Sequence, residues 1–161
     1  MCLAEAGVIA VVNSKCGQGD LGIVSARVLL VDDVETFRSL AASILGNHPG
    51  FQIVGEAKDG QEAVQKAQEL KPDLVVLDIG LPKLHGIEVA ARIRSMSPDS
   101  KILFFTLNDC ARIVLEALDV GGDGYVVKLD TAGELLAAAE TVLQGRRYIS
   151  RLARLALCNV D

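Results

Sequence analysis

Carboxylate, hydroxyl and ammonium side chains directly follow four strand-like apolar runs in this chain. The runs occupy residues 28–31, 74–77, 101–105 and 124–127. The polar residues that follow them are, in order, Asp32 with Asp33, then Asp78, Thr106 and Lys128. Apolar runs without alternation are typical of parallel strands that are buried on both faces. Side chains that could do chemistry therefore come just after the strands of a predicted parallel sheet.

These polar groups are expected to meet at one edge of the sheet. In open α/β sheets, the carboxyl ends of the strands surround the ligand crevice. Three carboxylates at one place, those of Asp32, Asp33 and Asp78, repel one another unless a cation shares the site. Carboxylates, waters and phosphate oxygens are the ligands that Mg²⁺ prefers. The sequence therefore predicts a divalent metal site that faces the ammonium group of Lys128.

Each of these residues also has a purely structural interpretation. An Asp that follows a strand is often a helix N-cap, and Asp33 is a candidate for that role as well. Three carboxylates at converging strand ends, with Lys128 opposite, favour a joint site over separate caps. Tyr125 is either an ordinary core aromatic or a functional group. His85 is interpreted as a solvated loop residue, because the acidic cluster requires oxygen donors.

Strand and helix patterns alternate five times from residue 27 onward. The helices are expected after Asp33, after Asp59, after Gly86, over residues 111–120 and after Thr131. Their predicted buried stripes are Phe37, Leu40, Ala41 and Ile44; Ala63, Ala67 and Leu70; Ile87, Ala90 and Ile93; and Leu135, Ala138, Ala139 and Val142. Capping boxes are predicted for Asp59 with Glu62 and for Thr131 with Glu134, and Gly145 is expected to end the last helix. Five β/α units predict a three-layer α/β sandwich.

The chain divides into three segments. Residues 1–26 are rich in Gly, Ala and Ser and are interpreted as a flexible extension, with an added strand over residues 8–12 as the alternative. Residues 27–150 form the predicted domain. Residues 151–161 begin either a linker or an extra helix, because Leu152, Leu155 and Ala156 follow a helical spacing.

Composition excludes several classes of function. The net charge is −5 and the chain has no Lys/Arg-rich run, so it is not expected to bind nucleic acid directly. Its four cysteines lack C-x-x-C spacing and it has only two His, which excludes a typical zinc site and indicates free thiols in a reducing cytoplasm. No apolar stretch approaches the roughly 20 residues that span a bilayer. We therefore expect a cytoplasmic protein without membrane contact.

The stretch 28–150 resembles the receiver domain of two-component response regulators. The motifs VLLVDD, DLVVLDIGLPKLHG, a Thr that ends the fourth strand, and GYVVK occur in the family's order and spacing. The segment LLAAAETVLQGRRYIS is similar to the NarL-like subfamily, whose receivers usually precede a helix-turn-helix DNA-binding domain. The resemblance implies a flavodoxin-like (βα)5 fold with a parallel five-stranded sheet in the order 2-1-3-4-5.

The resemblance also implies a role for each polar residue. Asp78 would be the phosphoacceptor, because a carboxylate can attack phosphorus and hold an acyl phosphate. The Mg²⁺ ligands would be Asp33, Asp78 and the carbonyl of Gly80, with Asp32 acting directly or through water. Lys128 would pair with the phosphoryl oxygens and Thr106 would donate its hydroxyl to them. Tyr125 would be the aromatic residue that turns inward as Thr106 moves.

One residue departs from the family's pattern. The family usually has a small residue directly after the Thr, where its side chain flanks the phosphorylation site, and here that residue is Leu107. A large apolar group at this place is expected to narrow access to Asp78 or to slow a hydrolytic water. The departure bears on the rate of phosphorylation rather than on whether it occurs.

We therefore expect a signalling domain rather than an enzyme. It would take a phosphoryl group from a sensor histidine kinase. Phosphorylation would then change a surface formed by the fourth helix, fifth strand and fifth helix, and so control an output such as transcription. A second copy of the chain, in a homodimer, is a further expected partner. One alternative is a degenerate receiver that acts as a scaffold without phosphorylation. A second is an aspartyl-nucleophile phosphatase, which needs another Asp two residues after the nucleophile, where this chain has Gly80.

Overall fold

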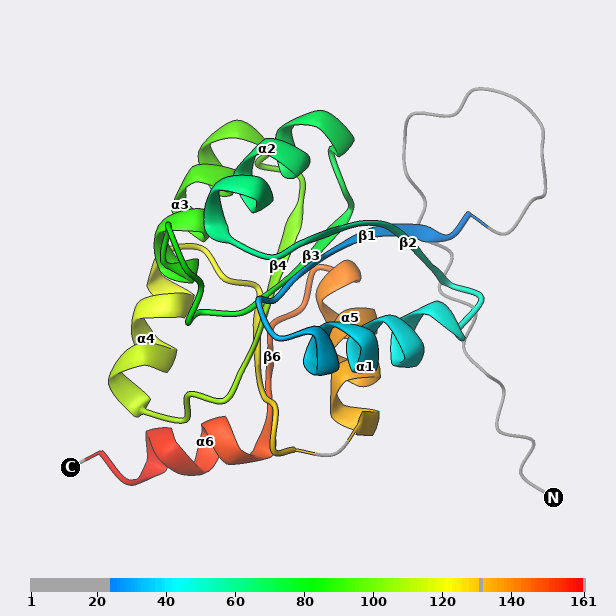
Figure 1. Cartoon of the computed structure of the whole chain (residues 1–161). Helices are drawn as coiled ribbons and strands as arrows, with labels where there is room; N and C mark the ends of the chain where they lie inside the picture. Colours follow the sequence, from blue (N-terminus) through cyan, green and yellow to red (C-terminus); the bar gives the residue numbers. More distant parts are fainter. Residues whose placement is uncertain (1–23, 131, 161) are drawn as a thin grey trace, which may run out of the picture.

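A parallel sheet runs through the centre of the molecule in a computed structural model that describes residues 24–130 and 132–160 (Figure 1). The strands are β1 (Ala26–Val31), β2 (Phe51–Ala57), β3 (Leu74–Leu77), β4 (Lys101–Thr106), β5 (Gly124–Val127) and β6 (Tyr148–Ile149). Their order in the sheet is β2-β1-β3-β4-β5-β6, and every neighbouring pair is parallel. The first five strands follow the flavodoxin-like order that the sequence predicted.

Helices cover both faces of this sheet and give the predicted three layers (Figure 1). They are α1 (Glu35–Gly46), α2 (Gly60–Leu70), α3 (Gly86–Met96), α4 (Ala111–Asp119), α5 (Ala132–Leu143) and α6 (Arg151–Cys158). One apolar core lies between the sheet and α1 with α5, and the other lies between the sheet and α2, α3, α4 and α6. All residues of β3 and β5 are buried, because both of their faces contact helices.

The sixth strand is an addition to the five that the sequence predicted. Tyr148 and Ile149 pair in parallel with Gly124 and Tyr125, so β5 is not the edge of the sheet. Two residues are too few to produce a recognisable apolar run, and the pairing is therefore invisible in the sequence. The next residue, Ser150, is fully buried, and its Oγ accepts a hydrogen bond of 3.1 Å from the backbone N–H of Val127.

The helix α6 follows β6 directly and occupies residues that the sequence left open between a linker and a helix. Its residue Ala153 is buried in the same core as α4, and Leu152 packs against that core. The carboxylates of the β5–α5 segment meet its first turn: Asp130 accepts from the backbone N–H of Leu152, and Glu134 accepts from that of Arg151. The end of β5 is therefore tied to the start of α6.

The buried face of α1 differs from the predicted stripe. Leu40 is 43% exposed, whereas Arg38, Ala41 and Leu45 are buried. Arg38 faces inward because its guanidinium donates a 2.9 Å hydrogen bond to the backbone carbonyl of Asp32 and lies 3.6 Å from the carboxylate of Glu56. An apolar pattern could not indicate this orientation, since the residue that decides it is charged.

The helix termini bear out one capping prediction and correct another. The Asp59 carboxylate accepts a 2.9 Å hydrogen bond from the backbone N–H of Glu62 at the start of α2, as predicted, whereas the Glu62 carboxylate accepts from the backbone N–H of Lys58 rather than from that of Asp59. The expected capping role of Asp33 was wrong, because the residue before α1 is Val34, whose N–H donates instead to Asp32. Thr131 and the alternative strand over residues 8–12 lie outside the described residues.

The helix α5 buries all four residues of its predicted stripe, and Gly145 follows it with a left-handed φ of +80°. Two of the four cysteines, Cys110 and Cys158, fall within the described residues, where both are free and exposed. None of the helices in the described part of the chain is long and apolar enough to cross a membrane.

Candidate functional site

The strand register aligns the ends of four strands at one edge of the sheet. Val31 of β1 is paired with Leu77 of β3, so the residues after them, Asp32 and Asp78, are neighbours. On the other side, Thr106 of β4 is paired with Val127 of β5, the residue before Lys128. Because β3 pairs with β4 as well, and Lys128 Nζ contacts Asp32 and Asp78 in a pocket that Thr106 also lines, the expectation that these polar groups meet is confirmed.

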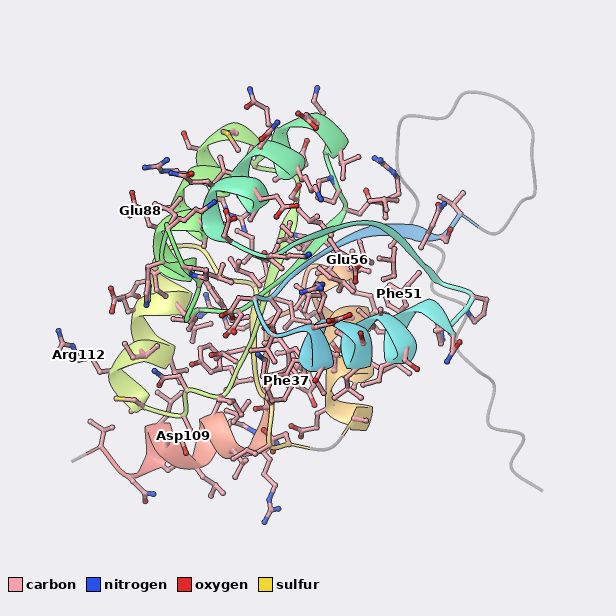
Figure 2. The ribbon with its side chains drawn as sticks, viewed as in Figure 1. Phe37, Phe51, Glu56, Glu88, Asp109 and Arg112 are labelled. Atoms are coloured by element: carbon pink, nitrogen blue, oxygen red, sulfur yellow. The ribbon has the colours of Figure 1, made fainter. Side chains whose placement is uncertain are left out.

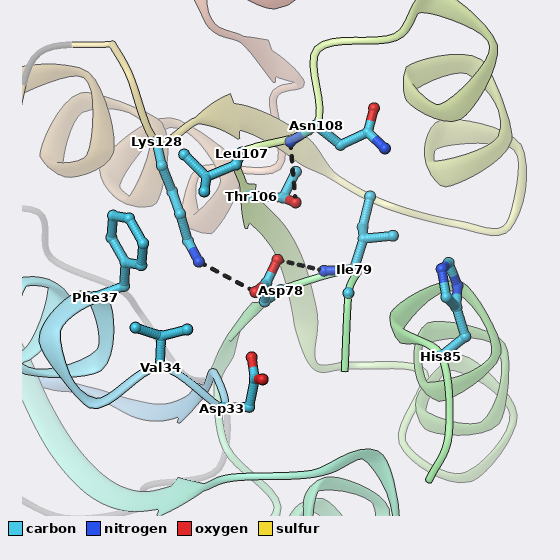
Figure 3. A pocket seen from close by; sticks show the side chains of 11 residues that line it. Asp33, Val34, Phe37, Asp78, Ile79, His85, Thr106, Leu107, Asn108 and Lys128 are labelled. Atoms are coloured by element: carbon cyan, nitrogen blue, oxygen red, sulfur yellow. Dashed lines mark hydrogen bonds and ion pairs between the residues drawn. The ribbon is translucent and has the colours of Figure 1, made fainter. Parts of the chain in front are cut away.

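Three carboxylates form a compact cluster at this edge. Asp32, Asp33 and Asp78 each offer an oxygen, and these oxygens lie within 4.8 Å of one another. Asp32 and Asp78 are buried, whereas Asp33 is exposed. Figure 3 shows Asp33 and Asp78 facing the same space from two different strand ends. The cluster is open to solvent on the Asp33 side and closed on the other.

The ammonium group of Lys128 closes the cluster from β5. Its Nζ lies 2.5 Å from Oδ2 of Asp32 and 3.1 Å from Oδ2 of Asp78, and its side chain is only 2% exposed. Figure 3 shows the Lys128 side chain extending to Asp78 across the pocket. One ammonium facing three carboxylates leaves a local excess of negative charge.

Burial and ionic contacts act in opposite directions on Asp32. Desolvation raises the pKa of its carboxyl above the ordinary 3.8, and the close contact and positive charge of Lys128 oppose that rise. Its Oδ1 accepts from the backbone N–H of Val34 at 2.9 Å. Its Oδ2 is buried and receives no conventional hydrogen bond from any described residue, so the ion pair with Lys128 is its one polar contact there.

The two oxygens of Asp78 have separate partners. Oδ1 accepts a 2.8 Å hydrogen bond from the backbone N–H of Ile79, which orients the carboxylate, and Oδ2 faces Lys128. The following loop packs tightly against the strand end, because a Cβ at Gly86 would lie 2.2 Å from the backbone carbonyl oxygen of Asp78. Gly80 faces open space, with nothing within 4 Å of where a Cβ would be. The carboxylate is thus fixed while the space beyond it stays free.

Thr106 and Tyr125 connect this pocket to neighbouring segments. The Oγ1 of Thr106 is 3.4 Å from the backbone N–H of Asn108, which donates to it. Tyr125 is fully buried, and its hydroxyl donates a 2.6 Å hydrogen bond to the backbone carbonyl of Asn108. Burial, with the negative charges of Asp109 and Asp78, raises the pKa of the Tyr125 phenol, so the hydroxyl stays protonated and remains a donor.

Comparisons with known proteins agree with this geometry. The response regulator receiver domain family matches residues 28–140. The chain belongs to this family. It is 45% identical over 120 residues to a putative transcriptional regulator of Pseudomonas aeruginosa. The aligned stretch covers 74% of this chain and 58% of that protein. The chain spans little more than half the length of the curated relatives it matches.

Solved receiver structures share the fold closely. A two-component response regulator of the LuxR family from Aurantimonas sp. SI85-9A1 has a TM-score of 0.80 at 36% identity, covering 84% of this chain and 96% of that one. The signal receiver domain of the putative response regulator NarL from Mycobacterium tuberculosis has a TM-score of 0.73 at 32% identity, covering 76% and 98%. These similarities agree with the NarL-like resemblance noted from the sequence.

The donor set of this receiver domain fits a divalent cation. All of the clustered side-chain donors are carboxylate oxygens, which Mg²⁺ prefers over nitrogen or sulfur ligands. Three carboxylates exceed the charge of the single Lys128, and Oδ2 of Asp32 is buried without a conventional hydrogen bond from the described residues. Asp32, Asp33 and Asp78 are therefore the residues that could hold the ion, with Gly80 beside them on the pocket wall.

The pocket contains residues that sequence reasoning did not assign to it. Leu107, which was singled out, does line it, and its side chain is 49% exposed. The full lining is Asp33, Val34, Phe37, Asp78, Ile79, Gly80, His85, Thr106, Leu107, Asn108 and Lys128 (Figure 3). Phe37 had been interpreted as part of the apolar stripe of α1, and His85 as a solvated loop residue. The first-turn position of Phe37, four residues after Asp33, was the available signal.

Proposed function

We propose that Asp78 accepts a phosphoryl group from a sensor histidine kinase in a Mg²⁺-dependent reaction. The observation that carries the proposal is the position of Asp78, which lines an open pocket as one of three clustered carboxylates and has its Oδ2 3.1 Å from Lys128 Nζ. An oxygen of Asp78 forms a bond to phosphorus while the bond from phosphorus to the histidine nitrogen of the kinase breaks. The leaving imidazole keeps the electron pair and takes up a proton from solvent.

The neighbouring residues have matching roles in this proposal. The ammonium of Lys128 already faces Asp78, where the phosphoryl group would arrive. It would therefore balance the negative charge on the transferred phosphoryl oxygens. Thr106 offers a hydroxyl at the end of the adjacent strand. Asp32, Asp33, Asp78 and the carbonyl of Gly80 would hold Mg²⁺, and the bound ion would neutralise charge on the phosphoryl group.

The switch in this proposal joins Thr106 to Tyr125 through Asn108. The backbone of Asn108 donates to Thr106 Oγ1 and accepts from the Tyr125 hydroxyl, so a shift of Thr106 toward the phosphoryl group would strain both contacts. The affected surface lies on α4 and α5, which flank the strand β5, whose residues are all buried. Because β6 pairs with β5 and α6 packs beside α4, these two elements belong to the same responsive surface.

The activity of the whole protein is also a proposal. Relatives that include transcriptional regulators support a transcriptional output through a region beyond this receiver, in the cytoplasm with the kinase. A homodimer of the phosphorylated chain is a further part of the proposal, and analytical ultracentrifugation with and without phosphorylation tests it.

A direct test uses Mg²⁺ with a small acyl-phosphate donor. The wild-type chain should gain one phosphoryl group by mass spectrometry, and Asp78→Asn should gain none while its circular dichroism spectrum is unchanged. Asp99→Asn is the matched control, since Asp99 is exposed and far along the chain in the turn before β4. A phosphoryl group that persists in Asp78→Asn would refute the assignment. An unmodified wild-type chain would favour the scaffold alternative.

A further inference from the structure

The ammonium group of Lys128 has three protons but only two carboxylate partners. Its Nζ faces Asp32 and Asp78, and no third oxygen among the described residues accepts from it. Two aromatic rings are also near: Nζ lies 4.1 Å from the centre of the Phe37 ring and 5.7 Å from that of the Phe105 ring. Both distances are within the roughly 6 Å over which a cation is attracted by a ring face.

Burial strengthens the attraction between the Lys128 ammonium and the two aromatic rings. The Lys128 side chain is 2% exposed, so water has little access to its ammonium group. The attraction between a cation and a ring is strongest where both are desolvated. Phe37 is the nearer ring, and Figure 3 shows it on the side of Lys128 away from Ile79 and His85, where it lines the pocket.

The position of Phe37 does not depend on Lys128. The adjacent residue Arg38 is buried, and its guanidinium donates a 2.9 Å hydrogen bond to the backbone carbonyl of Asp32. This bond ties the first turn of α1 to the end of β1. The backbone of Phe37 is therefore fixed beside the cluster, and from there its ring can attract the ammonium group of Lys128.

We propose that Phe37 is a positioning residue that keeps the Lys128 ammonium in the pocket when a divalent cation draws on the oxygens of Asp32 and Asp78. The inference rests on the proposed function. A cation that shares these oxygens weakens both ion pairs of Lys128 and repels its charge. Among the described residues, the ring faces of Phe37 and Phe105 attract the ammonium without using a carboxylate oxygen, and Phe37 is the nearer of the two. Lys128 then stays beside Asp78, where the phosphoryl group arrives.

The proposal predicts that loss of the Phe37 ring lowers the phosphorylation rate without lowering Mg²⁺ affinity. Without the ring, Lys128 can leave the pocket once Mg²⁺ is present, so the rate of phosphorylation by a small acyl-phosphate donor should fall. Mg²⁺ affinity should be unchanged or higher, because Phe37 contributes no ligand and a repelled ammonium no longer opposes the ion. A residue with only a packing role would lower stability and both of these quantities together.

The decisive experiment places fluorinated phenylalanines at position 37 by site-specific incorporation. Added fluorines weaken the negative ring face while nearly preserving its volume. From 4-fluoro- to 3,4,5-trifluorophenylalanine, the phosphorylation rate should fall progressively, reaching about tenfold, which corresponds to about 1.4 kcal/mol. The same series at Phe51, a buried ring near His48 that lies apart from Phe37 (Figure 2), is the matched control and should have no effect.

A second readout does not depend on phosphorylation. The readout is the acetylation of Lys128 by a small amine-reactive acetylating reagent in the presence of Mg²⁺, measured by peptide mass spectrometry. This acetylation should be slow in the wild type and at least several-fold faster in Phe37→Leu. Phe37→Tyr should restore protection, since it retains a ring face. A flat rate across the fluorinated series with unchanged Lys128 protection would overturn the inference. Failure of the wild type to be phosphorylated, with Lys128 protection still dependent on the ring, would instead count against the proposed function alone.

Discussion

The phenolic hydroxyl of Tyr125 donates a 2.6 Å hydrogen bond to the backbone carbonyl oxygen of Asn108. Asn108 is two residues beyond Thr106, and its backbone N–H donates a hydrogen bond to the hydroxyl of Thr106. A fully buried tyrosine of β5 is thus bonded to the segment that leads from the pocket into α4. Movement of that segment requires the loss or rearrangement of this bond.

Removing the hydroxyl should loosen the segment without creating a large cavity. We expect Tyr125→Phe to lower the free energy of unfolding by about 1 kcal/mol, since one buried hydrogen bond is lost. Urea unfolding measures this change. Amide hydrogen exchange should accelerate over residues 107–110 and stay unchanged in β1. Unaltered exchange over residues 107–110 would show that the hydroxyl does not restrain them.

Shortening Leu107 should open the pocket. We expect Leu107→Ala to speed both phosphorylation by a small acyl-phosphate donor and loss of the phosphoryl group, by about tenfold for a barrier change of about 1.4 kcal/mol. Mg²⁺ affinity should stay the same, because Leu107 supplies no ligand. Leu115→Ala on α4 is the control, with the same 49% exposure but outside this pocket. Two unchanged rates would mean that Leu107 does not limit access.

Mg²⁺ should stabilise the domain through the carboxylate cluster. At a free Mg²⁺ concentration of about 100 times the dissociation constant, the free energy of unfolding should rise by about 2.7 kcal/mol, because the ion binds the folded state selectively. Asp33→Asn should lose most of this gain, since Asp33 is the exposed carboxylate of the cluster. Asp99→Asn, with a similarly exposed residue outside the cluster, should keep it. Thermal unfolding over a Mg²⁺ titration provides the measurement.

The cap of α2 should make stability depend on pH. The backbone N–H of Glu62 and the ammonium of Lys83, 3.2 Å away, lower the pKa of Asp59 below its ordinary 3.8. A depressed folded-state pKa stabilises the protein above pH 3.8, and that contribution is lost as the pH falls through the folded value. Asp59→Asn keeps an oxygen cap but does not titrate. Its melting temperature should be lower than that of the wild type at neutral pH and converge with it in acid. A constant difference at all pH values would contradict the assignment.

The sequence by itself determined the fold class and the main polar residues of the site. Uninterrupted apolar runs indicate strands buried on both faces, and in a parallel sheet the residues after such runs must lie at one edge. The sequence could therefore predict that Asp32, Asp78 and Lys128 lie close together. Their positions follow from where the strands end and do not depend on how individual side chains pack. The cap at Asp59 was equally local, since its partner is three residues away.

Only the tertiary structure decided the contacts between elements. The inward direction of Arg38 depends on a carbonyl at the end of β1, and this orientation places Leu40 in solvent. The two-residue strand β6 exists because β5 offers it a partner. The approach of the Phe37 ring to Lys128 joins residues from opposite ends of the domain. None of these has a periodic signature, because each depends on where two distant segments lie in space.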